Sequence, residues 1–234
     1  MSTQNSQTRL LPGGSAAHSL LAGAAHRAGV AALALSFVVA AFVLWKVRPA
    51  DLLNTWYLTR AAGLVAYALL YLSVAVGLLQ TLGVLRAFAA PVAAMDVHEH
   101  LSLWALYATV FHAVILVWNS HQPFRVAALL LPFASDFEPA WVGLGVLATY
   151  TMVGAIISTY LRARLRPGQW RVLHLLTVVG FLFALVHAVA IGTDAVHPAV
   201  ALLYWLTGLS IGLLAAWRLI KGVRTLHADS PGRR

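Results

Sequence analysis

The chain has 234 residues, of which 61% are hydrophobic and only 10% are charged, and its mean hydropathy is +0.81. This composition excludes a soluble globular protein and places the chain among integral membrane proteins. The formal net charge of +9 comes from basic residues that flank apolar segments. This arrangement favours contact with anionic lipid headgroups and argues against a nucleic-acid role. Cysteine is absent, so any redox cofactor or metal must be held by other ligands, above all histidine.

In chain order, residues 1–27 are rich in Ser, Ala, Gly and Gln, which predicts a mobile cytoplasmic tail. Six apolar segments follow, each long enough to cross a bilayer at about 20 residues per helix. They lie at 28–47, 57–85, 97–118, 141–162, 171–191 and 199–219. Residues 221–234 form a second short tail. The expected fold is therefore all-α, a polytopic membrane domain of six helices over residues 28–220.

The distribution of basic residues predicts the orientation of these segments. Twelve of the 16 Lys and Arg residues lie in the two tails, in the connections after the second and fourth segments, or at the segment ends that border these regions. The other four lie on the opposite side: Lys46, Arg48, Arg60 and Arg125. By the positive-inside rule, both termini of this multi-pass cell-membrane protein are expected in the cytoplasm.

The third and fifth segments each carry two histidines at nearly equal spacing. His98 and His112 are 14 residues apart, and His174 and His187 are 13 apart. At about 1.5 Å per residue, each pair spans roughly 20 Å of helix, about two thirds of the hydrocarbon thickness. Both segments run from inside to outside, so His98 shares a depth with His174, and His112 with His187. Since imidazole is a common axial haem ligand, the pattern predicts two six-coordinate b-type haems between these helices.

Other readings of the histidines stay open. A histidine in a membrane span can relay protons, contact a transported substrate or form a hydrogen bond in the bundle core. The matched depths favour haem, because a transporter predicts no such matching. One tension remains, since at about 100° per residue a spacing of 13 leaves His187 well off the helix face of His174. Either this helix twists locally or the two haems are rotated relative to each other.

The connection at 119–140 contains an apolar run, 126–133, that is expected to lie in the membrane interface and could cap the outer haem. Acidic residues on this outer side are Asp136, Glu138 and Asp194. They could attract ferric species or a basic partner, or they could be ordinary solvated loop acids.

Several short motifs resemble one known family. They are the run Trp56–Gly63, the run His98–Leu103 leading to His112, the run Trp170–His174 leading to His187, and Gly192–Asp194. Together they resemble the ferric reductase-like transmembrane domain over about residues 55–220. That family includes the membrane part of ferric reductases and NADPH oxidases, and the haem-bearing membrane subunit of the periplasmic methionine sulfoxide reductase system.

The resemblance implies that His98, His112, His174 and His187 ligate two b-type haems, with electrons passing from the cytoplasmic haem to the outer one. Arg60 matches an arginine near the outer haem and could pair with a haem propionate, although it could also be a snorkelling interfacial residue. Arg171 could serve the inner haem in the same way. Three further arginines, Arg162, Arg164 and Arg166, would set topology or form a docking face for a partner.

The chain also departs from that family. It shows no glycine-rich dinucleotide turn, and only about 14 residues follow the last span, so no flavin or nicotinamide domain is expected in it. The expected electron donor is a cytoplasmic flavin/NAD(P)H reductase or a membrane quinol. The expected acceptor lies outside and is ferric iron or a partner reductase subunit. Leu116 stands where oxygen-reducing members place a histidine, which argues against superoxide production. The alternatives are a quinol-linked cytochrome b without a dedicated acceptor protein, and a haem-free transporter.

Overall fold

A computed structural model describes residues 55–119 and 123–228 of the chain. All of these residues belong to one compact unit, Arg48–Arg234. The predicted tail 1–27, the predicted first span 28–47 and the last residues 229–234 lie outside the described residues, so these predictions remain untested.

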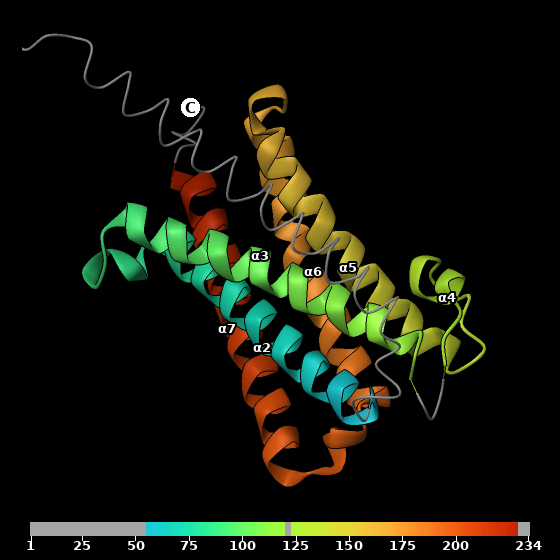
Figure 1. The fold of residues 1–234 in the computed structure, drawn as a ribbon. Helices are drawn as coiled ribbons and strands as arrows, with labels where there is room; N and C mark the ends of the chain where they lie inside the picture. Colours follow the sequence, from blue (N-terminus) through green and yellow to red (C-terminus); the bar gives the residue numbers. More distant parts are fainter. Residues whose placement is uncertain (1–54, 120–122, 229–234) are drawn as a thin grey trace, which may run out of the picture. The chain divides into compact units, whose positions relative to one another are not determined.

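Within the described ranges the regular structure is entirely helical, without a strand (Figure 1). The five long helices are α2 (Thr55–Leu82), α3 (Pro91–Leu116), α5 (Pro139–Tyr160), α6 (Pro167–Ile191) and α7 (Pro198–Ala228). The short ones are η2 (Val84–Ala87), α4 (Val126–Leu130), η3 (Arg162–Arg164) and η4 (Thr193–Val196). The expectation of an all-α fold is confirmed for this part of the chain.

The five long helices correspond to the last five predicted spans. Each is long and apolar enough to cross a membrane, with α7 qualifying over Pro198–Gly222. The described residues therefore form a helical protein with five candidate membrane-spanning helices.

Proline and glycine set several helix ends. Four of the long helices, α3, α5, α6 and α7, begin at a proline, whose fixed φ and missing N–H suit the first helical position. After α2, Gly83 adopts a left-handed φ of 78°, which a residue with a side chain adopts less readily. Helix α3 begins six residues before the predicted segment and α6 four residues before it, because the prediction used hydropathy alone and did not take the prolines into account.

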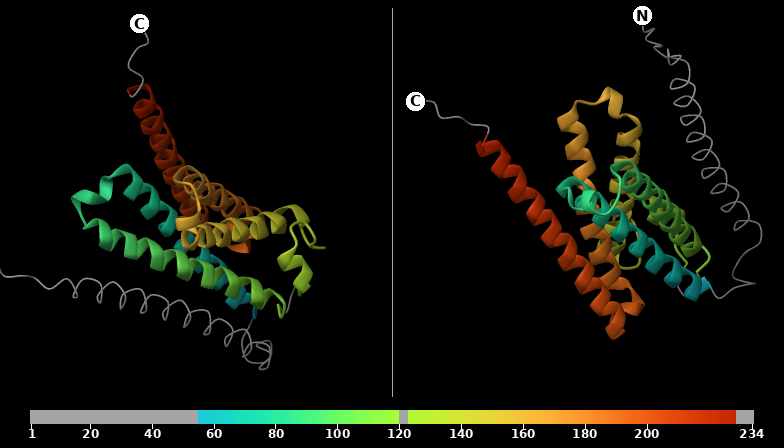
Figure 2. Two further views of the ribbon diagram at one scale, coloured as in Figure 1. Left: turned by 90° about the horizontal axis from the view of Figure 1, so that it is seen from above. Right: turned by 90° about the vertical axis from the view of Figure 1, so that its left-hand side faces the viewer.

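The helices pack as two antiparallel pairs. Helix α2 lies along α3, and α5 lies along α6, each pair joined by a short connection (Figures 1 and 2). Helix α7 packs against both α2 and α6. The histidine-bearing helices α3 and α6 therefore belong to different pairs, and each has a close neighbour whose backbone can contact its side chains.

Aromatic side chains fill the core between α2, α6 and α7. Phe181 is fully buried, and its ring centroid lies 5.7 Å from that of Tyr67. Tyr67 also meets the Tyr204 ring edge-on at 4.9 Å, and its hydroxyl lies 2.5 Å from the Thr207 hydroxyl. This cluster ties α7 to the two helix pairs.

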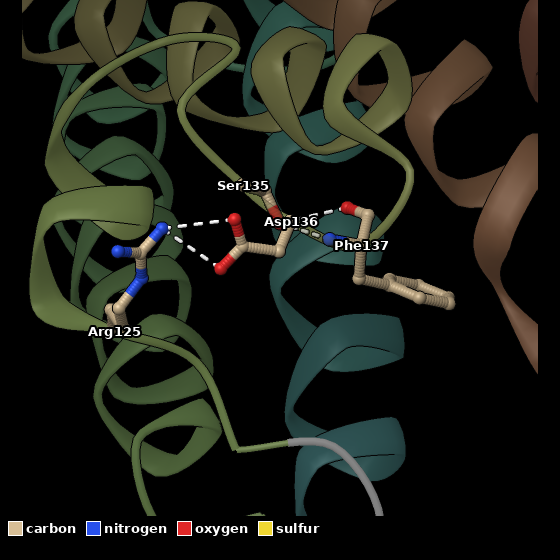
Figure 3. Close-up of polar contacts among 4 residues, drawn as sticks. All are labelled: Arg125, Ser135, Asp136 and Phe137. Carbon is tan, nitrogen blue, oxygen red and sulfur yellow. Dashed lines mark hydrogen bonds and ion pairs between the residues drawn. The ribbon is translucent and has the colours of Figure 1, made fainter.

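The connection between α3 and α5 is held by polar contacts (Figure 3). The guanidinium of Arg125 pairs with the Asp136 carboxylate at 2.8 and 3.0 Å. The Ser135 hydroxyl donates to the Phe137 carbonyl at 2.7 Å and accepts from the Phe137 amide at 3.2 Å. Only the first part of the apolar run 126–133 is helical, as α4.

Candidate functional site

The four predicted histidines lie on two helices that belong to different pairs. His98 and His112 project from α3, and His174 and His187 project from α6, which runs as one α-helix through both positions. All four side chains are half-buried. Their surroundings differ in a way that bears on what the rings can bind.

Three of the four imidazoles form a hydrogen bond to a backbone carbonyl of the neighbouring helix. In each case the ring nitrogen is Nδ1. The bonds are His98 to Ser73 at 2.9 Å, His112 to Thr59 at 2.9 Å and His187 to Trp141 at 2.8 Å. The first two acceptors belong to α2 and the third to α5, so both helix pairs use the same device.

Each of these three rings also lies against a glycine. A Cβ atom placed on the glycine would stand 3.0 Å or less from the ring atom Cε1. The pairs are Gly77 with His98 at 3.0 Å, Gly63 with His112 at 3.0 Å and Gly145 with His187 at 2.8 Å. Every one of these glycines follows the carbonyl acceptor by four residues, which is about one helical turn. The glycine makes room for the ring, and the carbonyl one turn earlier accepts its hydrogen.

This arrangement fixes the tautomer of the three rings. A carbonyl oxygen only accepts hydrogen bonds, so Nδ1 must carry the hydrogen. The neutral imidazole then carries its lone pair on Nε2, which is free to bind a metal. Metal-ligating histidines usually donate their other ring N–H to a carbonyl or carboxylate in this way, which orients the ring and raises its basicity.

The structure brings His98 and His174 together. Their ring centroids are 5.9 Å apart, with 68° between the ring planes. Two imidazoles on opposite sides of one metal, with bonds of about 2 Å, have centroids about 6 Å apart. The separation therefore suits a shared metal ion. The pairing of His112 with His187 stays a prediction.

A bare metal ion fits these pairs less well than haem iron. The described ranges contain no group of three or more His, Cys, Asp or Glu able to hold a metal ion. Two imidazoles complete the coordination only of a metal that brings its own remaining ligands, as haem iron does. The donor set of the His98–His174 pair therefore suits haem iron better than a bare metal ion.

His174 lacks both the carbonyl acceptor and the adjacent glycine that position the other three rings. Its Nδ1 is buried without a hydrogen-bond partner, and no described glycine lies against it. Instead the ring stacks on Trp170, with centroids 5.1 Å apart and 22° between planes. The guanidinium of Arg162 lies over the Trp170 ring, with its carbon Cζ 4.4 Å from the ring centroid. An aromatic path therefore leads from an exposed arginine to the His98–His174 pair.

Arg60 is engaged with a carboxylate of the protein itself. Its Nε donates to Asp194 Oδ2 at 3.0 Å, and a second guanidinium nitrogen binds Oδ1, so the pair is bidentate. This hydrogen-bonded guanidinium holds the pKa of Asp194 below its ordinary value. The side chain also lies near the rings of Trp56 and Tyr57. The predicted contact of Arg60 with a haem propionate stays a prediction.

The remaining predicted polar residues lie apart from the histidine pairs. Arg171 is exposed, and its Nε donates to the Pro167 carbonyl at 3.2 Å, so its propionate contact also stays a prediction. Asp136 and Asp194 are each paired with an arginine. Pairing of these two acids reduces the negative charge that was expected to attract cations on this side.

The sequence interpretation gave no role to Gly77 or Gly145, and it named Gly63 and Trp170 only as parts of the motifs that carry the resemblance. A signal for two of the glycines was present, because Gly63 and Gly77 are 14 residues apart, the same spacing as His98 and His112. Equal spacing on antiparallel neighbouring helices brings both glycine–histidine pairs into contact at once. The stacking of Trp170 on His174 had only a weaker signal, their separation of four residues on one helix.

Over residues 55–119 and 123–228, the fold and the site define an all-helical arrangement with five candidate membrane-spanning helices and two histidine-bearing helices in separate pairs. Residues 54–194 match the family described as a domain of unknown function, DUF8596, and the chain belongs to that family. The matched region runs from the start of α2 to Asp194 and so contains all four histidines. No curated protein and no solved structure matches the chain.

Proposed function

We propose that the protein is the haem-binding membrane subunit of an oxidoreductase system and conducts electrons across a membrane through two bis-histidine b-type haems. The observation that carries this proposal is the orientation of three imidazoles by Nδ1–H bonds to carbonyls, with Nε2 left free. The resemblance to the ferric reductase-like transmembrane domain supports it.

His98 and His174 would hold the haem nearer the cytoplasm, and His112 and His187 the outer one. When bound, each haem supplies a reversible one-electron change at its iron. The protein orients the ligands and surrounds them with apolar helices. Phe181 lies about midway along α6 between His174 and His187, is fully buried, and contacts the rings of Tyr67 and Tyr71, so α6 is closely packed against α2 between the two levels.

Electrons would reach the first pair from the end of the molecule that carries Trp170. This ring connects the exposed Arg162 to His174. Three other exposed arginines, Arg164, Arg166 and Arg171, surround the same end of α6. This positively charged cluster suits an acidic surface on an electron donor, so a cytoplasmic flavin reductase is favoured over a membrane quinol. The acceptor outside would be ferric iron or a partner reductase.

The experiment that tests this proposal is the haem content of the full chain purified in detergent after haem-supplemented expression. We expect two b-type haems per chain in oxidised and dithionite-reduced spectra. His112→Ala or His187→Ala should lose the outer haem, because one imidazole remains at that site. His100→Ala is the matched control, since His100 is exposed on the same helix as His112 and bonds only to the Asp96 carbonyl.

A wild-type protein without haem would contradict the proposal and support the haem-free transporter. Two haems retained in either the His112→Ala or the His187→Ala variant would contradict the ligand assignment. Loss of haem in His100→Ala as well would show that the losses report general misfolding.

A further inference from the structure

The two histidine pairs differ chemically at one position. His98, His112 and His187 each have a carbonyl acceptor for Nδ1 and a glycine against the ring. His174 has neither, and its buried Nδ1 has no partner among the described residues. The pair His112–His187 thus has two fixed ligands, whereas the pair His98–His174 has only one.

The helix register indicates why His174 lacks this support. On α2 the two glycines are 14 residues apart, which equals the spacing of the histidines that they face on α3. Thirteen residues beyond Gly145 on α5, which matches the spacing on α6, stands Ser158. Ser158 is buried, and its hydroxyl donates to the Ala155 carbonyl at 2.8 Å. A serine side chain thus occupies the register position at which a glycine would open space for His174.

The stacking on Trp170 stabilises the position of the His174 ring whether or not the ring binds a metal. The contact holds one face of the imidazole at 5.1 Å between centroids. It does not fix the tautomer, because it engages no ring nitrogen. Loss of a supporting hydrogen bond to a metal-ligating histidine typically costs about 10- to 100-fold in metal affinity. His174 is therefore expected to bind iron more weakly than the other three, and it keeps a packing partner when it leaves the metal.

We infer that His174 is a displaceable ligand, so that the His98–His174 site accepts a small neutral ligand in place of the imidazole, whereas the His112–His187 site does not. The ligand class is a diatomic such as CO or NO, which has a lone pair for iron and dissolves in lipid. This inference rests on the proposed function, because it requires haem at both sites.

The test is titration of the dithionite-reduced full chain with CO, followed in the Soret band. We expect CO to bind about half of the haem, which is one per chain. Binding to none of the haem, or to all of it equally, would overturn the inference. Two haems without CO binding would leave the proposed function intact, whereas absence of haem would contradict both.

Variants assign the CO site. In His187→Ala, which keeps only the His98–His174 haem, the fraction of haem that binds CO should rise from about half to nearly all. In His98→Ala, which keeps only the other haem, the fraction should fall to nearly none. The opposite pattern would overturn the inference. Where a variant fails to fold, the titration of the wild-type chain still decides.

A substitution at Ser158 tests whether the missing carbonyl acceptor is the reason that His174 is displaceable. Ser158→Gly opens space beside α6 and should let His174 reach the Gly154 carbonyl, which lowers the CO affinity about tenfold or more by the same logic as above. Thr159→Gly is the matched control, because Thr159 is the next residue and is exposed. An unchanged CO affinity in Ser158→Gly would overturn the link between lability and the missing carbonyl.

Discussion

At the residue scale, an imidazole in an apolar helix bundle must satisfy two nitrogens with few polar groups nearby. A helical carbonyl already bonded in its own helix has a second lone pair and can accept from Nδ1. A side chain one turn later would block the approach of the ring, and glycine removes this obstacle. The pairs Ser73/Gly77, Thr59/Gly63 and Trp141/Gly145 show the same solution three times.

This combination of a carbonyl acceptor and a glycine one turn later predicts the effect of Gly145→Ala. The added Cβ would stand 2.8 Å from both Cε1 and Nδ1 of His187, so the ring must move and its bond to the Trp141 carbonyl must lengthen or break. We expect about 10- to 100-fold weaker binding of the outer haem. The measurement is haem retention during competition with apomyoglobin.

The matched control is Gly154→Ala on the same helix, where an added Cβ meets nothing within 4 Å. This variant should retain both haems with unchanged affinity. Equal haem retention in the Gly145 and Gly154 variants would show that the glycine beside His187 has no positioning role.

The ion pair of Arg60 and Asp194 predicts a dependence of stability on pH. Arg60 lowers the pKa of Asp194 below its ordinary 3.8 in the folded protein. The pair therefore stabilises the fold above pH 3.8, and this contribution is lost as the pH falls through the folded pKa. Asp194→Asn should lower the thermal unfolding midpoint at neutral pH.

The difference between the midpoints of wild-type protein and Asp194→Asn should shrink as the pH is lowered toward about 3. Thermal unfolding in detergent over this range is the measurement. A difference that stays constant with pH would mean that the ionised carboxylate of Asp194 contributes nothing to stability.

At the element scale, the long helices were predictable because apolar runs of spanning length are the strongest signal in the sequence. Their starts were less predictable, since the prolines at 91 and 167 allow helix to extend beyond the apolar run. Spans two to six correspond to α2, α3, α5, α6 and α7. The short helix α4 was not distinguished from the rest of its apolar run, because five residues are too few for a periodic pattern.

The candidate site was predictable only in part, because the sequence shows the histidines but not the backbone groups that face them. The histidines are visible in the sequence as rare polar residues in apolar helices. Which carbonyl faces a ring depends on how two helices are aligned along each other, and the sequence does not state this alignment. Even so, the equal spacing of Gly63/Gly77 and of His98/His112 indicates one alignment of α2 along α3, the one that places each glycine beside a histidine. The partner of Arg60, Asp194, is 134 residues away and had no local signal.

At the scale of the whole molecule, the orientation of the helices across the membrane decides in which direction the proposed conduit would carry electrons. The basic cluster around Trp170 and the Arg60–Asp194 pair lie near opposite ends of α6, since Trp170 is in its first turn and Asp194 is the third residue after its end. If the first end faces the cytoplasm, electrons leave at the end that carries His187. Orientation is therefore the property that would give the two proposed haem sites a defined direction of electron transfer.

The absence of cysteine makes this orientation directly measurable, because any introduced thiol is the only one in the chain. Asp136 precedes α5 and Arg164 follows it, and both are exposed. We expect a membrane-impermeant maleimide to label Asp136→Cys in intact cells and Arg164→Cys only after permeabilisation, as the positive-inside rule requires. Labelling of both from the same side would mean that α5 does not span the membrane. The reverse pattern would keep the span but invert the direction of electron flow.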